Sequence, residues 1–315
     1  MKFKDYNYER YSYEAYAEAM QQAGTRLKEA KDYQSFKKAF DEGKRAFEHL
    51  DTMYNICYVR YTINTNDAFY QKENDYWDEA MPKMKSLTTA FDKEVLASPF
   101  AEELKKDVPE TYFLLAEFAQ KSFCDEIIEE LQEENRLQSS YQKLIASAQI
   151  PFDGDIYTLS ELGVKMECDD RDIRKRATQA YWGWMQSHQD EIDDLYDRMV
   201  KVRDRMAKKL GYKNYVELAY MLQCRFDYKQ EDVANYRRQV LEDVVPLCNA
   251  LYERQRERLG YDRLHVYDEK YEFASGNPTP KYDTQEMIAR ANTMYHELDE
   301  RCGTFFDFMV EHDLL

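Results

Sequence analysis

The sequence predicts an all-α protein of long antiparallel helices, with one small β-hairpin near residues 149–159. Three observations support this fold class. Glycine and proline are scarce, with 9 and 7 in 315 residues, so few positions interrupt a helix. Hydrophobic residues make up 43% of the chain, enough for a sizeable core. In most segments the apolar residues recur every three, four and seven positions, which is the period of an amphipathic helix.

The first half of the chain predicts long helices joined by short connections, which is typical of antiparallel helical hairpins. Asp32 precedes a helix expected over residues 33–63, and a second helix is expected over residues 66–96. Pro82 lies inside the second helix and should kink or divide it, because proline lacks the backbone N–H. Residues 125–146 predict a further helix.

The pattern changes after Ala148. An Asp153-Gly154 turn is flanked by alternating apolar residues, which predicts a β-hairpin over residues 149–159. We treat this hairpin as a marker between two helical portions. The expected division is therefore a helical N-terminal domain at residues 1–147, a hairpin and connection at residues 148–168, and a second helical region at residues 169–315.

The last region again shows the helical period. Asp169 or Asp170 is expected to cap a long helical region that reaches Leu210 and stops at Gly211. The strongest loop signal in the chain lies at residues 275–280. A short helix is expected over residues 214–222, and a long one over residues 231–259, with Pro246 inside it and Gly260 at its end. A further helix is expected to begin at a capping box of Asp283 and Glu286 and to break at Cys302-Gly303, and a last one is expected over residues 305–315.

Charge and hydropathy exclude several classes of partner. The formal net charge is −17, so a nucleic acid is a poor partner because its phosphates would be repelled. No basic cluster offsets this charge, which also disfavours anionic membranes. No stretch approaches the roughly 20 apolar residues of a membrane span, and the first ten residues lack the apolar core of a signal peptide. We therefore expect a soluble, cytoplasmic protein.

The cysteines are scattered and include no C-x-x-C pair. In a cytoplasmic chain of this size, we expect buried or partly buried free thiols rather than disulfides. The six residues are Cys57, Cys124, Cys168, Cys224, Cys248 and Cys302.

The strongest metal-ligand candidate is His296, which begins the run His-Glu-Leu-Asp-Glu. A helical zinc-peptidase site needs two histidines four residues apart on one helix face, with a glutamate between them. Here Glu300 occupies the second histidine position. His296 and Glu300 could share a metal, but we favour a surface pair of helical neighbours.

The other candidate residues also favour structural interpretations. His265 could line a pocket, but a partly buried histidine with satisfied hydrogen bonds is the commoner case; His49 and His188 lie in charged helices and are expected at the surface. Adjacent acids such as Asp125-Glu126 point in different directions on a helix and cannot form a facing acid–base pair. No nucleophile turn, phosphate-binding glycine loop or dinucleotide motif is present. The tyrosines that could offer hydrogen bonds to a peptide, but more commonly pack, are Tyr6, Tyr8, Tyr11, Tyr13 and Tyr16.

Several stretches, in order along nearly the whole chain, resemble the oligoendopeptidase family, peptidase family M3, which includes oligoendopeptidase F and thimet oligopeptidase. No single stretch is diagnostic, but their colinearity is. They are residues 51–54, 66–75, 131–135, 143–150, 152–154, 157–162, 206–215, 224–228, 276–278 and 305–310.

The resemblance implies a helical ellipsoid that encloses a channel and admits short oligopeptides. A zinc ion held by a His-Glu-x-x-His helix and a later glutamate would polarise the scissile carbonyl and activate water. This chain contains no His-Glu-x-x-His, and it ends at Leu315, before that motif would begin. We therefore carry over no catalytic or metal-binding residue, leave substrate-binding residues unassigned, and expect zinc only in the complete enzyme.

Two hypotheses remain. In the first, the chain is the N-terminal part of a zinc metalloendopeptidase for short oligopeptides, inactive alone and forming an incomplete half of a channel-enclosing peptidase. That hypothesis predicts exposed apolar surface on the last helices. In the second, it is a non-enzymatic helical module that binds peptides or a partner chain.

Overall fold

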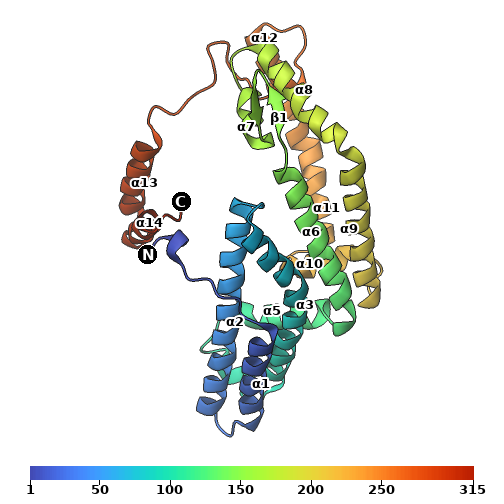
Figure 1. The fold of residues 1–315 in the computed structure, drawn as a ribbon, viewed down its shortest axis with the longest axis vertical. Helices are drawn as coiled ribbons and strands as arrows, with labels where there is room; N and C mark the ends of the chain where they lie inside the picture. The colour runs from blue at the N-terminus through green and yellow to red at the C-terminus, as the bar shows by residue number, and fades with distance from the viewer.

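The computed structural model describes all 315 residues, and helices make up most of it (Figure 1). The only sheet is an antiparallel pair of short strands, so the predicted all-α class with one β-hairpin is confirmed. The helices of the first half are α1 (Tyr13–Glu29), α2 (Tyr33–Ile63), α3 (Ala68–Ala97), α4 (Ala101–Leu104), α5 (Glu110–Ser122) and α6 (Ile128–Ala146), with short 3-10 turns at Phe3–Asp5 and Asp125–Ile127.

Helices α1, α2 and α3 pack against one another, and α5 and α6 pack on α3. The largest buried core of the molecule lies in this bundle and includes Tyr16, Phe36 and Trp77. The tyrosines near the N-terminus are part of this packing, as the favoured interpretation predicted. Those that pack against the core, besides Tyr16 within it, are Tyr6, Tyr8, Tyr11 and Tyr13.

Side-chain caps set the starts of the two longest helices. The Asp32 carboxylate accepts a hydrogen bond from the Ser35 backbone N–H at 2.8 Å, and the Ser35 hydroxyl lies 3.4 Å from the Asp32 nitrogen. Asp67 caps α3 by accepting from the Phe69 N–H at 2.9 Å. Each cap satisfies donors that a helix start leaves unpaired. The helices predicted over residues 33–63 and 66–96 are confirmed as α2 and α3.

Pro82 does not divide α3, which runs unbroken from Ala68 to Ala97. A proline inside a helix removes one N–H and crowds the carbonyl of the preceding turn. Side chains of α6 compensate: Asn135 donates to the Asp78 carbonyl at 3.0 Å, and Gln132 donates to the Glu79 carbonyl at 2.6 Å. The carbonyls of Asp78 and Glu79, in the turn before Pro82, therefore keep hydrogen-bond partners.

The β-hairpin consists of β1 (Ile150–Phe152) and β2 (Asp155–Tyr157), with Ile150 opposite Tyr157. Asp153 and Gly154 form the turn with φ of 49° and 94°, the left-handed region that the predicted D-G turn requires. Ile150 and Phe152 are buried in a small core beside the next two helices. The helices after the hairpin are α7 (Leu159–Lys165), α8 (Arg171–Ser187), α9 (Gln189–Lys209) and α10 (Tyr215–Leu222).

The helical region predicted to reach Leu210 is confirmed, but two helices divide it at a break that the sequence pattern does not indicate. Asp170 caps α8, as one of the two predicted choices. Helix α8 ends at Ser187, and His188 separates it from α9 with φ of −109° and ψ of 13°. The His188 ring donates from Nδ1 to the Trp184 carbonyl at 2.9 Å and stacks on the Trp184 ring. This side chain binds a carbonyl in the last turn of α8 and so favours a break without glycine or proline.

The helix predicted over residues 231–259 is continuous but not uniform. It consists of α11 (Gln230–Gln239), a π-helical turn η3 (Val240–Val244) and α12 (Val245–Leu259). The wider π turn directly precedes Pro246, whose ring would otherwise crowd the carbonyl four residues earlier. Gly260 ends the helix with φ of 69°, as predicted.

The last two helices, α13 (Thr284–Leu298) and α14 (Glu300–Glu311), pack as a hairpin. The predicted break at Cys302-Gly303 is wrong: the break lies at Asp299, whose carboxylate caps α14 through the Arg301 N–H at 2.8 Å. Gly303 instead allows close packing, because a Cβ there would lie 2.3 Å from Nδ1 of the His296 ring. The glycine therefore marks a helix crossing rather than a helix end.

Figure 1 shows the α13–α14 hairpin apart from α11 and α12, at the end of a long loop and beside the N-terminus. The Phe3 N–H donates to the His312 carbonyl at 3.1 Å, and Lys2 pairs with Asp313 at 2.7 Å.

None of the helices has the length and apolar character that a membrane span requires. All six cysteines are free; the prediction of buried or partly buried thiols is wrong for Cys224 and Cys248, which are exposed.

Candidate functional site

His296 and Glu300 do not form a helical pair. Asp299, with an extended backbone at φ of −166° and ψ of 141°, separates the helix that ends at Leu298 from the helix that begins at Glu300. The interpretation of these residues as helical neighbours is therefore wrong. His296 instead pairs with Asp307 across the α13–α14 hairpin, with Nε2 and Oδ2 3.0 Å apart. Hydrogen bonds from Asn292 and His296 lower the pKa of the Asp307 carboxyl group.

The remaining histidines contact aromatic side chains rather than other metal-ligand types. Their ring partners are Tyr11 for His49, Trp184 for His188, Tyr267 for His265 and Phe308 for His312. No group of three or more His, Cys, Asp or Glu side chains comes together in a way that could hold a metal ion. The residues of this chain therefore do not fit the zinc that the resemblance implies.

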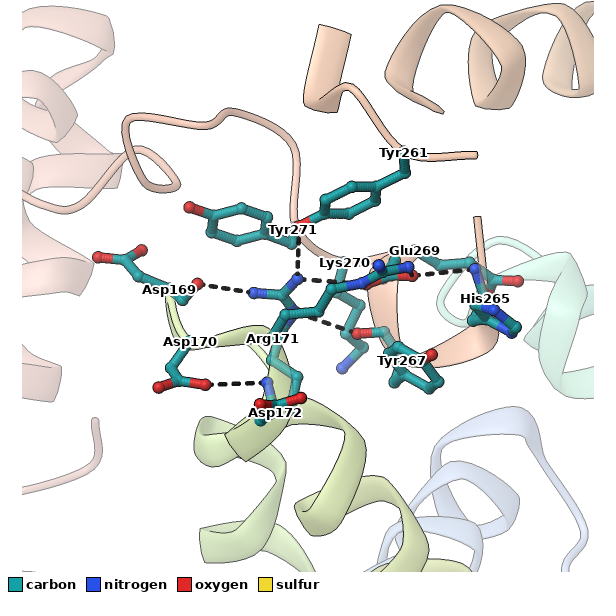
Figure 2. Close-up of polar contacts among 12 residues, drawn as sticks. Asp169, Asp170, Arg171, Asp172, Tyr261, His265, Tyr267, Glu269, Lys270 and Tyr271 are labelled. Carbon is teal, nitrogen blue, oxygen red and sulfur yellow. Dashed lines mark hydrogen bonds and ion pairs between the residues drawn. The ribbon is translucent and has the colours of Figure 1, made fainter. Parts of the chain in front are cut away.

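A buried ionic cluster joins the start of α8 to the loop after α12 (Figure 2). Asp268 and Arg174 are both fully buried. Asp268 accepts hydrogen bonds from Arg171 at 2.8 and 3.0 Å, from Arg174 at 3.2 Å and from the His265 backbone N–H at 3.0 Å. Burial opposes ionisation of this carboxyl group, but the hydrogen bonds outweigh burial and lower its pKa.

Aromatic rings enclose the two guanidinium groups of this cluster (Figure 2). The Arg171 guanidinium carbon lies 3.8 Å from the centroid of the Tyr261 ring, and that of Arg174 lies 4.1 Å from the centroid of Tyr271. Arg174 also donates to the Cys168 carbonyl at 2.8 Å. Because both oxygens of the carboxylate and both guanidinium groups already have protein partners, the cluster fixes the loop and offers no group to a ligand.

A cavity with a volume of about 510 Å³ lies in the N-terminal half, among α2, α3, α5 and α6. That volume falls in the range of small-molecule sites. Its wall combines apolar and aromatic groups with polar side chains. The lining residues are Phe47, Leu50, Tyr54, Tyr58, Asn74, Trp77, Asp78, Met81, Pro82, Lys85, Thr88, Thr89, Asp92, Ala119, Leu131, Asn135, Gln138, Ser139 and Gln142.

Three ionisable groups of α3 face this cavity. Burial raises the pKa of Asp92 to about 6, against a hydrogen bond from the Tyr112 hydroxyl at 2.8 Å that lowers it. Burial also raises the pKa of Asp78, although the Ser139 hydroxyl donates to it at 2.7 Å. Burial lowers the pKa of the Lys85 ammonium group.

Sequence reasoning did not identify this cavity, because its walls come from four helices whose packing the sequence does not specify. One signal was available. Asp78, Lys85 and Asp92 recur every seven residues, which places three charged groups on one face of a helix that otherwise packs inward.

Comparisons with protein-family models find two matches. The model of the peptidase M3 N-terminal domain matches residues 3–123, and the model of peptidase family M3 matches residues 164–298. A search of curated proteins finds no match.

Solved structures match almost the whole chain. A protein described as oligoendopeptidase F from Bacillus anthracis strain Ames is 41% identical, with a TM-score of 0.96 over 100% of this chain and 58% of its own length. PZ peptidase A, solved with an inhibitor, is 42% identical, with a TM-score of 0.96 over 99% of this chain and 56% of its own.

A more distant structure supports the fold alone. Oligoendopeptidase F from Enterococcus faecium is 17% identical, with a TM-score of 0.68 over 93% of this chain and 62% of its own. This chain thus spans little more than half the length of the two similar structures at about 40% identity. Together with the two family models, these matches show that the chain belongs to peptidase family M3.

Proposed function

We propose that this chain is the N-terminal part of a zinc-dependent metalloendopeptidase that hydrolyses internal bonds of short oligopeptides. The observation that carries the proposal is the match of the entire chain, at 41% identity, to a protein described as an oligoendopeptidase. Because residues 1–315 do not form a metal site, the proposal assigns the zinc ligands and the catalytic glutamate to protein outside these residues. A cytoplasmic location and the division at residues 1–147, 148–168 and 169–315 remain parts of this proposal.

Exposed apolar surface on the last helices supports the proposal, and the expectation of such surface is confirmed by the burial of individual residues. Helices α11 and α13 contain no buried residue. Leu241 and Leu247 are 66% and 59% exposed, and Met294 and Leu298 are 67% and 74% exposed. Large apolar side chains exposed on helices are typical of an interface with further protein. In this proposal the rest of the catalytic domain covers it.

The 315-residue chain alone is expected to be inactive as a peptidase. It should be incubated with a quenched fluorogenic oligopeptide and zinc, beside the same mixture with a chelator. We expect no difference between the two rates, because hydrolysis by this route needs a metal held by a complete set of ligands. Turnover above the chelated control would refute the inactivity of this chain.

The reading frame after the codon for Leu315 tests the parent activity. We expect it to continue into a His-Glu-x-x-His motif, and the longer protein to hydrolyse the same oligopeptide in a chelator-sensitive way. A stop codon at that place, together with binding of the oligopeptide without hydrolysis, would instead favour the non-enzymatic binding module.

A further inference from the structure

The cavity among α2, α3, α5 and α6 contains charged groups that the chain itself does not pair. Lys85 forms no hydrogen bond or ion pair; the contact found for its ammonium group is with the Phe123 ring, whose centroid lies 5.5 Å away. Asp92 accepts one hydrogen bond, from Tyr112 to Oδ1, which leaves Oδ2 without a partner. Both side chains are partly buried, line the cavity and lack a charged protein partner in contact. Both groups are therefore suited to receive a ligand group of the opposite charge.

The two groups have opposite charge, and this restricts the ligand. A simple anion would pair with Lys85 alone, and a simple cation would pair with Asp92 alone. Only a molecule with both a positive and a negative group satisfies both residues at once.

We propose that this cavity binds a small zwitterion, an α-amino acid or a dipeptide, whose carboxylate binds Lys85 and whose ammonium group binds Asp92. Asp78 is the second candidate acceptor: its Oδ1 has no partner either, but its Oδ2 accepts from Ser139 at 2.7 Å and lies 3.4 Å from the Asn74 amide, so its carboxylate has more protein contacts than that of Asp92. The proposal does not depend on the peptidase proposal, since every lining residue lies within this chain.

The spacing of the two residues along α3 agrees with a ligand of this size. Lys85 and Asp92 are seven residues apart in α3, a rise of about 10.5 Å along the helix axis. One extended residue with a charge-assisted hydrogen bond at each end spans about 9 Å, and a dipeptide spans about 13 Å. The rise of about 10.5 Å lies between these two spans. The long, flexible Lys85 side chain can adjust its reach to either ligand.

The rest of the wall favours an apolar side chain on the ligand. Tyr54, Met81 and Leu131 line the cavity from α2, α3 and α6. Contact with these groups removes apolar ligand surface from water, which adds affinity without a further charge. Leucine and the dipeptide Leu-Leu are therefore suitable probes.

Titration calorimetry of the 315-residue chain tests the proposal. We expect leucine or Leu-Leu to bind at least tenfold more tightly than its N-acetylated form and its C-terminal amide, each of which lacks one charge. The better of the two zwitterions distinguishes an amino-acid site from a dipeptide site. Equal binding of the charged and blocked forms, or no binding of leucine and Leu-Leu at millimolar concentration, would overturn the proposal.

Variants then test the two named contacts. Lys85→Met should remove the preference for the free carboxylate over the amide, and Asp92→Asn should remove the preference for the free ammonium over the acetylated form. Lys83→Met is the matched control, because Lys83 lies on the same helix with its side chain exposed and outside the cavity. If Asp78→Asn rather than Asp92→Asn removes the ammonium preference, the assignment of Asp92 is wrong.

Discussion

Asp92→Asn is expected to stabilise the folded chain near neutral pH. Burial raises the pKa of Asp92 from 3.8 to about 6, and each pKa unit corresponds to about 1.4 kcal/mol, so ionisation in the folded state costs about 3 kcal/mol. An asparagine carries no charge, and its carbonyl oxygen can still accept the Tyr112 hydrogen bond. We therefore expect the free energy of unfolding to rise by roughly 1–3 kcal/mol near pH 7.5.

The sign of the pH dependence follows from the direction of the shift. Because the folded-state pKa is raised, the protonated carboxyl group stabilises the wild-type fold fully below about pH 4, and this contribution is lost as pH rises through about 6. The advantage of Asp92→Asn should therefore appear between about pH 4 and pH 6.

Urea unfolding of the wild type and the variant across this window measures the effect. Asp227→Asn, at an exposed aspartate, is the control and should change the unfolding free energy little. If Asp92→Asn is no more stable than the wild type near pH 7.5, or if its advantage does not change with pH, the carboxylate is not destabilised by burial. Either result would refute the reasoning.

Two further changes test the packing of the chain. Gly43→Ala should lower the free energy of unfolding by about 1–3 kcal/mol in urea titrations, because the added Cβ would lie 2.4 Å from Cζ of Phe91. Gly24→Ala is the matched control, because Gly24 also lies inside a helix but has nothing within 4 Å of an added Cβ. This control should raise the free energy of unfolding by about 0.5–1 kcal/mol. Equal effects of the two changes would contradict the close packing at Gly43. Asp268→Asn should destabilise the chain by about 3–5 kcal/mol, because Arg174 would stay buried without its charged partner; an unfolding midpoint within about a degree of wild type would refute it.

The sequence predicts those parts of the fold that short-range signals determine. Asp32 and Asp170 each cap the helix that follows them, and the Asp153-Gly154 turn supplies the backbone geometry of a tight hairpin. In each case the determining groups lie within four residues of the boundary. A single sequence contains that information because it does not depend on which helices pack together.

The errors and the features that the sequence does not indicate arise where packing decides. The break at His188 has no glycine or proline, and depends on a ring that stacks on Trp184. Gly303 resembles a helix stop, yet it lies inside a helix because the His296 ring occupies the space of its missing Cβ. The α3 cavity shows the same limit: its charged residues are visible in the sequence, but the gap between four helices is a product of their arrangement.

Buried residues are concentrated in the N-terminal bundle and are few in the last helices, so the last helices have fewer tertiary contacts to stabilise them. Helices of fewer than about 12–15 residues are marginal in water without tertiary contacts. Helix α12 has such support, because Gln255 is buried and donates to the carbonyls of Asp268 and Tyr271 at 3.2 and 2.8 Å. The α13–α14 hairpin has much less: Lys2 and Asp313 pair on the surface, and such pairs add little to stability.

The exposed side chains of this hairpin include large apolar ones such as Met294 and Leu298, so a surface that covered them would stabilise it by removing that area from water. The stability of α13 and α14 therefore depends on such a covering more than that of any helix in the N-terminal bundle, whose own core already buries its apolar faces.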